Sequence, residues 1–151
     1  MRILIAPDSF KGTMTSSEVC RVVATEIKEL RPDAEVVCLP VADGGEGSVD
    51  AFAAALGERA QIVTVKGTDS FGCVRHDMKI CVFGKTAVIE TAQSVGLQPN
   101  RLDIMNSTTY GVGALIKAAL DAGCRKLIFC LGGSGTNDMG AGAACAMGAK
   151  F

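Results

Sequence analysis

Three loops rich in glycine, carboxylates and hydroxyls each follow a short apolar segment, and this arrangement constrains the fold most strongly. The loops are residues 7–13 (PDSFKGT), 42–48 (ADGGEGS) and 132–138 (GGSGTND). Open α/β sheets place ligands at the carboxyl ends of their strands, and clustered glycine lets the backbone approach a ligand closely. The pattern therefore predicts an α/β protein whose ligand site is built from these loops.

The segments around the first two loops alternate between strand and helix patterns. Apolar runs at 3–6 and 36–39 each end at a proline, which is typical of buried strands in a parallel sheet. Between them, apolar residues recur at helical spacing behind Thr15 and Glu18, which fit a capping box. A second helix is predicted over 48–56. This order predicts a parallel three-layer α/β/α sheet of the Rossmann or flavodoxin-like type.

The middle of the chain has a different pattern. Val74, Met78, Ile80 and Val82 alternate with polar residues, which predicts a half-exposed strand, and residues 83–86 form a plausible hairpin turn into a strand at 87–92. Antiparallel pairing there would mark part of a second, smaller α/β lobe. We therefore expect residues 1–66 to be the first part of a Rossmann-like domain. Residues 67–151 would form a second lobe that is incomplete at its C-terminus.

The last third of the chain returns to alternating helices and strands. Asn106 or Ser107 is predicted to cap a helix that runs to about residue 122. A buried strand is expected at 127–131, and a helix of small residues at 140–148.

Composition excludes several classes of function. The net charge of the 151 residues is −1, without a basic cluster, and aromatic residues are scarce, so neither a nucleic acid nor an anionic membrane is an expected partner. Seven cysteines without a C-x-x-C motif, and a single histidine, favour reduced thiols over disulfides or zinc. We find neither a signal peptide nor an apolar run that could span a bilayer. These features predict a cytoplasmic protein.

The first loop offers a carboxylate, a hydroxyl and an ammonium group in Asp8, Ser9 and Lys11. Lysine can hold a phosphate or a substrate carboxylate as a point charge. A solvated turn capped by aspartate is the alternative interpretation.

The second loop carries two carboxylates, Asp43 and Glu46, around Gly44 and Gly45. Carboxylate oxygens suit Mg²⁺, and a carboxylate can also orient or deprotonate a substrate hydroxyl. A simple turn and helix start is the alternative, although it does not require three glycines.

The third loop resembles an anion site at the start of a helix, where backbone N–H groups and hydroxyls can bind phosphate. Its candidate residues are Gly132, Gly133, Ser134, Thr136, Asn137 and Asp138. A glycine turn with an Asn or Asp cap is the alternative.

The three loops, in this order, resemble the signature segments of the glycerate kinase family. The matching segments read IAPDSFKG, ADGGEG and GGSGTND, and supporting stretches occur at 90–97 and 108–113. The resemblance implies an ATP-dependent kinase that phosphorylates D-glycerate, an organic acid, to phosphoglycerate, with ATP and Mg²⁺ as cofactors. We expect Asp8, Lys11, Asp43 and Glu46 to be catalytic, with Asp43 and Glu46 also as Mg²⁺ ligands. Ser9, Gly44, Gly45 and the six residues of the third loop would bind substrate or phosphate.

The chain departs from the family pattern in two respects. Gly135 stands where the family usually has alanine, and Met139, which adds bulk beside the expected phosphate site, where it usually has glycine. Family members are also much longer, so this chain is predicted to be a fragment with doubtful activity of its own. The alternatives are a non-catalytic fragment that binds a nucleotide or anion, or one half of a split kinase. Self-association or a missing C-terminal partner is then expected.

Overall fold

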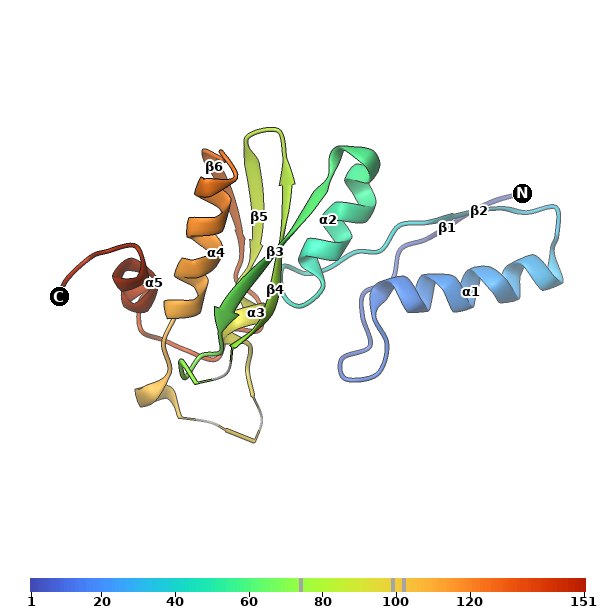
Figure 1. The fold of residues 1–151 in the computed structure, drawn as a ribbon. Coiled ribbons are helices and arrows are strands. Elements are labelled where there is room, and N and C mark those ends of the chain that lie inside the picture. Colours follow the sequence, from blue (N-terminus) through green and yellow to red (C-terminus); the bar gives the residue numbers. More distant parts are fainter. Residues whose placement is uncertain (74, 99, 102) are drawn as a thin grey trace.

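The computed structural model describes residues 1–73, 75–98, 100–101 and 103–151, so the predicted strand position Val74 lies outside the described residues. The chain forms two sheets surrounded by helices (Figure 1). The first elements are β1 (Arg2–Ile5), α1 (Ser16–Leu30), β2 (Glu35–Cys38), α2 (Ser48–Leu56), the 3₁₀ turn η1 (Gly57–Arg59) and β3 (Gln61–Thr68). They are followed by β4 (Arg75–Phe83), β5 (Thr86–Glu90), α3 (Ala92–Val95), η2 (Ile104–Asn106), α4 (Tyr110–Asp121), β6 (Lys126–Cys130) and α5 (Ala141–Ala146).

The prediction of an α/β fold with parallel strand pairs is confirmed. β1 and β2 pair in parallel and form a sheet of their own, while the second sheet has the order β3-β4-β5-β6. In this second sheet β5 and β6 are parallel, whereas β3 with β4 and β4 with β5 are antiparallel. The β4–β5 pair is the antiparallel hairpin expected around residues 83–86. Residue 66, the last of the predicted first domain, lies inside β3, and the division into domains stays a prediction.

The four-stranded sheet is covered by a helix on each face, because its central strands alternate between two sets of buried side chains. Ile80 and Val82 of β4 face the cluster that includes Leu115 of α4. Cys81, between them, faces the cluster that includes Val49 of α2. Figure 1 shows α2 and α4 on opposite sides of this sheet. The main core therefore lies in residues 48–146 rather than around the first strand.

The unit formed by β1, α1 and β2 extends away from this core (Figure 1). The prediction that the first strand is buried is wrong for most of its residues. Leu4 is 63% exposed, and Ile5 is the one residue of β1 that is buried. α1 packs against β1 and β2. Burial of a parallel strand requires cover on both faces of the sheet, and among the described residues α1 covers this pair from one side.

The helix predicted to start after Asn106 or Ser107 begins later, at Tyr110 with Thr109 as its N-cap. Asn106 instead ends the short turn η2, where Asp103 accepts hydrogen bonds from its backbone and side-chain amides. This local bond competes with α-helix formation, as short polar side chains often do. Within the part of the chain that the structure describes, no helix is both long and apolar enough to cross a bilayer.

Candidate functional site

The second and third glycine loops are in direct backbone contact. The N–H group of Gly132 donates to the carbonyl oxygen of Gly44 at 2.8 Å. A Cβ at position 132 would lie 2.8 Å from both the Cα and the nitrogen of Gly45. Glycine is therefore required at 132 by close approach, and the two loops form one continuous surface.

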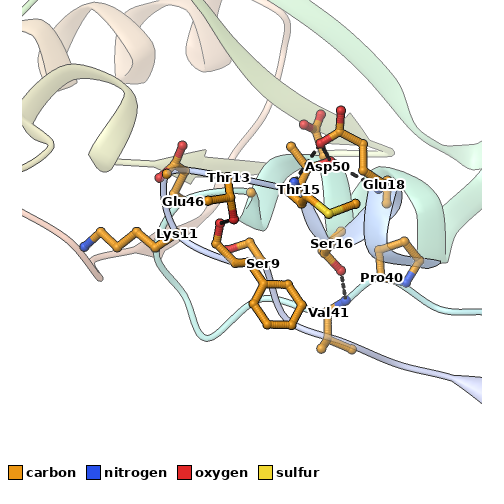
Figure 2. Close-up of a pocket in the computed structure, with 16 residues that line it drawn as sticks. Ser9, Lys11, Thr13, Thr15, Ser16, Glu18, Pro40, Val41, Glu46 and Asp50 are labelled. Atoms are coloured by element: carbon orange, nitrogen blue, oxygen red, sulfur yellow. Dashed lines mark hydrogen bonds between the residues drawn. The ribbon is translucent and has the colours of Figure 1, made fainter. Parts of the chain in front are cut away.

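The first loop is joined to the second through Ser16, at the start of α1. Its hydroxyl donates to the carbonyl oxygen of Pro7 at 2.6 Å and accepts from the N–H group of Val41 at 3.1 Å. Figure 2 shows the Ser16–Val41 bond beside Pro40. Thr15 caps the same helix in a complete capping box with Glu18, which confirms the sequence prediction. One helix start thus holds the segments that lead into both loops.

A cleft of about 860 Å³ lies where the loops meet. Seven of the predicted site residues line it: Asp8, Ser9, Lys11, Asp43, Gly45, Glu46 and Gly133. A neighbouring pocket of about 480 Å³, shown in Figure 2, shares Ser9, Lys11 and Glu46 with the cleft. All three loops therefore contribute side chains or backbone to one cavity.

The other six predicted site residues lie outside the cleft lining. They are Gly44, Gly132, Ser134, Thr136, Asn137 and Asp138. The first two form the contact between the loops described above. Ser134 is exposed, but its hydroxyl is engaged within the protein: it lies 3.0 Å from that of Thr91 and donates to the carbonyl oxygen of Leu131.

The third loop also uses part of its backbone for protein contacts. Gly135 donates from its N–H group to the carbonyl oxygen of Val95 at 2.6 Å, and Leu97 donates to that of Gly133 at 2.8 Å. These bonds hold the loop against the end of α3. The amides of Gly132 and Gly135 are consequently engaged, and in the described chain those of Gly133 and Ser134 are left for a ligand.

The helix start behind the third loop is occupied by a carboxylate of the protein itself. Asp138 accepts from the N–H groups of Gly140 at 3.1 Å and Gly142 at 3.0 Å, at the beginning of α5. It also accepts from the backbone N–H and the hydroxyl of Thr109, at 2.7 and 2.9 Å. Burial raises the pKa of Asp138, but the hydrogen bonds from Thr109, Gly142 and Gly140 outweigh burial and lower the pKa overall. These contacts favour the alternative interpretation of Asp138 as a cap.

The wall of the cleft opposite the first loop is formed by β4 and α3. The side-chain amide of Gln93 accepts from the N–H group of Lys79 at 2.7 Å and donates to its carbonyl oxygen at 2.9 Å. The Nε2 atom of His76 lies 2.6 Å from the backbone carbonyl oxygen of Gln93. These bonds fix the edge of β4 where it extends beyond its pairing with β5.

The comparisons with known proteins agree with this architecture. The model of the Glycerate kinase family matches residues 3–151. The chain belongs to the glycerate kinase family. It is 43% identical to the glycerate 2-kinase of Escherichia coli (strain K12) and 43% identical to the glycerate kinase of Bacillus subtilis (strain 168), with all of this chain covered in both cases.

A crystal structure from the same family supports the fold. The chain is 40% identical to a Salmonella typhimurium LT2 protein assigned as glycerate kinase 2, with a TM-score of 0.77 over 98% of this chain and 41% of that one. The chain spans about two fifths of the length of the curated relatives it matches (40% of each).

The charge of the cleft is mainly negative. Seven carboxylates line it, against two lysines, Lys11 and Lys79. In the described part of the chain, neither lysine lies within 4 Å of a carboxylate oxygen. Both ammonium groups are thus available to an anionic ligand.

The carboxylate pair predicted to hold Mg²⁺ has the right donor chemistry. Asp43 and Glu46 both line the cleft, and Oδ1 of Asp43 also accepts from the N–H group of Gly45 at 2.9 Å. Mg²⁺ is commonly held by one or two carboxylates together with substrate phosphates and water. No group of three or more His, Cys, Asp or Glu among the residues described is placed to hold a metal. The pair therefore fits a Mg²⁺ ion shared with a nucleotide rather than an all-protein metal site.

Sequence reasoning missed several residues of the cleft. The predicted site residues include neither Glu90 nor His76. Glu90 is a buried residue at the end of β5 and lines the cleft. His76 lies in β4 and lines the cleft as well. Lys79 and Gln93 were not singled out. A polar residue at the end of an apolar strand was the available signal for Glu90, whereas the Gln93 contact depends on where β5 ends.

Proposed function

We propose that this chain carries part of the active site of a glycerate kinase, which transfers the γ-phosphoryl group of ATP to glycerate. The convergence of Lys11, Asp43 and Glu46 on one cleft is the observation that carries the proposal. Phosphoryl transfer depends mainly on positioning and on neutralising charge. A cleft with carboxylates for a metal–nucleotide complex and free lysines for an anion suits that chemistry.

In the proposed reaction, a hydroxyl oxygen of glycerate bonds to the γ-phosphorus of ATP. The bond from this phosphorus to the bridging oxygen breaks, ADP leaves, and the hydroxyl proton passes to a carboxylate, for which Asp8 and Asp43 are the candidates. Lys11 neutralises a phosphate or the glycerate carboxylate. Asp43 and Glu46 would hold Mg²⁺, which when bound supplies charge neutralisation at the phosphates.

The remaining predicted residues take supporting roles in the proposal. Ser9 and the backbone of Gly45 and Gly133 contact the substrate or its phosphates. Gly44, Gly132, Ser134, Thr136, Asn137 and Asp138 shape the loops from behind. Since the Escherichia coli relative is named glycerate 2-kinase, we propose the 2-hydroxyl group as the acceptor.

The wider setting of the chain is also part of the proposal. We propose that β1, α1 and β2 belong to a three-layer Rossmann-like domain over residues 1–66, and that residues 67–151 belong to a second lobe. Because the relatives are longer, turnover is expected to need the rest of the family sequence, as a covalent continuation or a separate partner. Free thiols at all seven cysteines support a reducing compartment such as the cytoplasm.

A chimera tests the proposed activity. This chain replaces the matching two fifths of the Escherichia coli relative, and ATP-dependent phosphorylation of glycerate is measured together with the identity of the phosphoglycerate. Lys11→Ala and Asp43→Asn should each lower kcat/KM about 10²-fold or more, as expected for charges that act in the transition state. The matched controls Lys117→Ala and Asp121→Asn, on the exposed side of α4, should have little effect. Unchanged turnover in both site variants would overturn the assignment.

The alternative of binding without turnover is tested on the chain alone. Titration with ATP and Mg²⁺, followed by calorimetry, should show binding that Lys11→Ala weakens and Lys117→Ala does not. If the chimera binds ATP but phosphorylates no glycerate, the non-catalytic alternative replaces the kinase proposal.

A further inference from the structure

Glu90 is a buried acid that none of the proposed roles uses. It is the last residue of β5, it is 4% exposed, and it lines the cleft. Its Oε2 atom accepts from the N–H group of Val49 at 3.0 Å. Val49 lies in the first turn of α2, 41 residues earlier in the sequence. The contact therefore joins the second loop to the sheet across a long sequence separation.

Helix α2 needs this contact because it lacks a cap of its own. Its N-cap residue is Gly47, which has a φ of 87° and makes no side-chain cap bond. The first N–H groups of a helix have no partner within the helix and are usually capped by a side chain at the N-cap position. Glu90 supplies the missing acceptor from a different element, and the charge of its ionised carboxylate is favourable at the positive end of the helix.

Burial raises the pKa of Glu90, and the nearby carboxylates of Asp50 and Glu46 also raise it. The backbone N–H groups of Val49 and Gly47 lower this pKa. The net effect is a raised pKa. An acid in this position costs free energy that a surface cap would not cost. Such a cost is typical of residues kept for a role at a site, although the geometry of the contact carries the argument.

We propose that Glu90 is a positioning residue that holds the loop 43–47 against the carboxyl end of β5. The loop is then attached at two points: Gly132 binds the carbonyl oxygen of Gly44, and Glu90 binds the N–H group of Val49, just beyond the loop. Asp43 is adjacent to the first anchor, and Glu46 lies three residues before the second. The consequence for catalysis rests on the proposed function, because Glu90 would act through Asp43 and Glu46. The structural role of Glu90 does not depend on the proposed function.

Amide hydrogen exchange measured by NMR on this chain tests the structural role. In Glu90→Ala, the protection of the Val49 amide should fall about tenfold more than that of Ile80 in the centre of β4, since a hydrogen bond to a charged acceptor is lost. Glu90→Gln keeps one oxygen acceptor and should cause a smaller but still local loss. Glu29→Ala and Glu29→Gln, on the exposed surface of α1, are the matched controls.

Two outcomes overturn the proposal. One is a uniform change, in which Val49 loses no more protection than Ile80. The other is a Glu90→Gln variant indistinguishable from Glu29→Gln. If Glu90→Ala does not fold, the Glu90→Gln comparison with Ile80 decides the question alone.

The chimera then separates this inference from the proposed function. Glu90→Gln should lower kcat while the KM for ATP stays within about twofold, because a displaced loop weakens interactions made in the transition state. If the chimera has no glycerate kinase activity but the Glu90 variants still show a local loss of amide protection, the proposed function is refuted and the structural role of Glu90 stands. An active chimera in which Glu90→Gln changes neither kcat nor local protection would refute the role of Glu90.

Discussion

The side-chain amide of Gln93 pairs with both backbone groups of Lys79, accepting from its N–H at 2.7 Å and donating to its carbonyl oxygen at 2.9 Å. Pairing of β4 with β5 ends at Ile80 and Ile89. Beyond this point Gln93 continues the hydrogen bonding of the β4 edge with a side chain instead of a strand. The wall of the cleft that bears Lys79 and His76 is therefore held by one residue of α3.

Replacing Gln93 by alanine should release this edge. We expect Gln93→Ala to lower the free energy of unfolding by about 1–2 kcal/mol, the range for two hydrogen bonds at a partly exposed site. Exchange of the Lys79 amide should accelerate more than that of Ile80. Gln98→Ala removes an exposed glutamine at the same cleft and should change stability by less than about 0.5 kcal/mol. Equal effects of the two variants, measured by urea unfolding and hydrogen exchange, would contradict the assigned role of Gln93.

Asp138 should act as a shared cap for α4 and α5. Asp138→Ala removes bonds from Thr109, Gly140 and Gly142, and we expect a loss of about 2 kcal/mol of unfolding free energy, as for strong N-caps. Asp121→Asn on the exposed end of α4 serves as the control. If phosphate binding were the main role of Asp138 instead, Asp138→Ala would impair ligand binding and leave stability near that of the control.

The same carboxylate predicts a pH dependence of stability. The folded-state pKa of Asp138 is lowered below the ordinary value of an aspartate. Its contribution is therefore complete above the unfolded-state pKa and is lost as the pH falls through the lower, folded-state pKa. Urea unfolding between pH 7 and pH 2 should show wild type and Asp138→Asn converging at the acid end. A constant difference across this range would show that ionised Asp138 is not the source of the stabilisation.

Gly132→Ala should disturb the contact between the second and third loops. Its Cβ would lie 2.8 Å from two backbone atoms of Gly45, which cannot yield as a flexible side chain could. We expect a loss of about 1–3 kcal/mol, with amide chemical-shift changes at Gly44 and Gly45. Gly123→Ala introduces strain at a φ of 82° without any new contact, so it should leave the shifts of Gly44 and Gly45 unchanged.

The thiols should fall into two groups of reactivity. Cys38, Cys73 and Cys145 are exposed, whereas the other four cysteines are buried. Burial raises the pKa of Cys20 and of Cys81, which further lowers their thiolate fraction. A thiol-reactive dye should therefore label three groups quickly and the rest only after unfolding, and Cys38→Ser should reduce the fast group to two. Rapid labelling of more than three groups in the folded chain would contradict this packing.

Much of the local structure could be predicted from the sequence. Thr15 and Glu18 form the expected capping box, and the predicted helix at 48–56 has the observed bounds. The turn after Phe83 joins two antiparallel strands as expected. These features depend on residues a few positions apart, whose propensities and hydrogen bonds act within one segment. The predicted convergence of three loops followed from the rule that strand ends share an edge of the sheet.

The long-range contacts around the site could not be predicted in the same way. Glu90 binds Val49 across 41 residues, and Asp138 binds Thr109 across 29. Residue type alone made Asp138 a candidate for phosphate binding and did not make Glu90 a site candidate. Which carboxylate caps which helix depends on how the helices pack on the sheet. The sequence pattern contains no direct signal for this packing.

The sequence was enough to identify the three glycine loops, their order and the family to which they belong. Motif spacing and strand patterns are properties of short segments, so they can be recognised without a structure. Tertiary structure alone decided which parts of these loops face a ligand. In the folded chain Asp8, Lys11, Asp43 and Glu46 line one cleft. Asp138 accepts hydrogen bonds at the start of α5, and Glu90 does so at the start of α2. The physical reason is that a buried backbone N–H group binds whichever acceptor packing brings within about 3 Å, and packing depends on the whole chain.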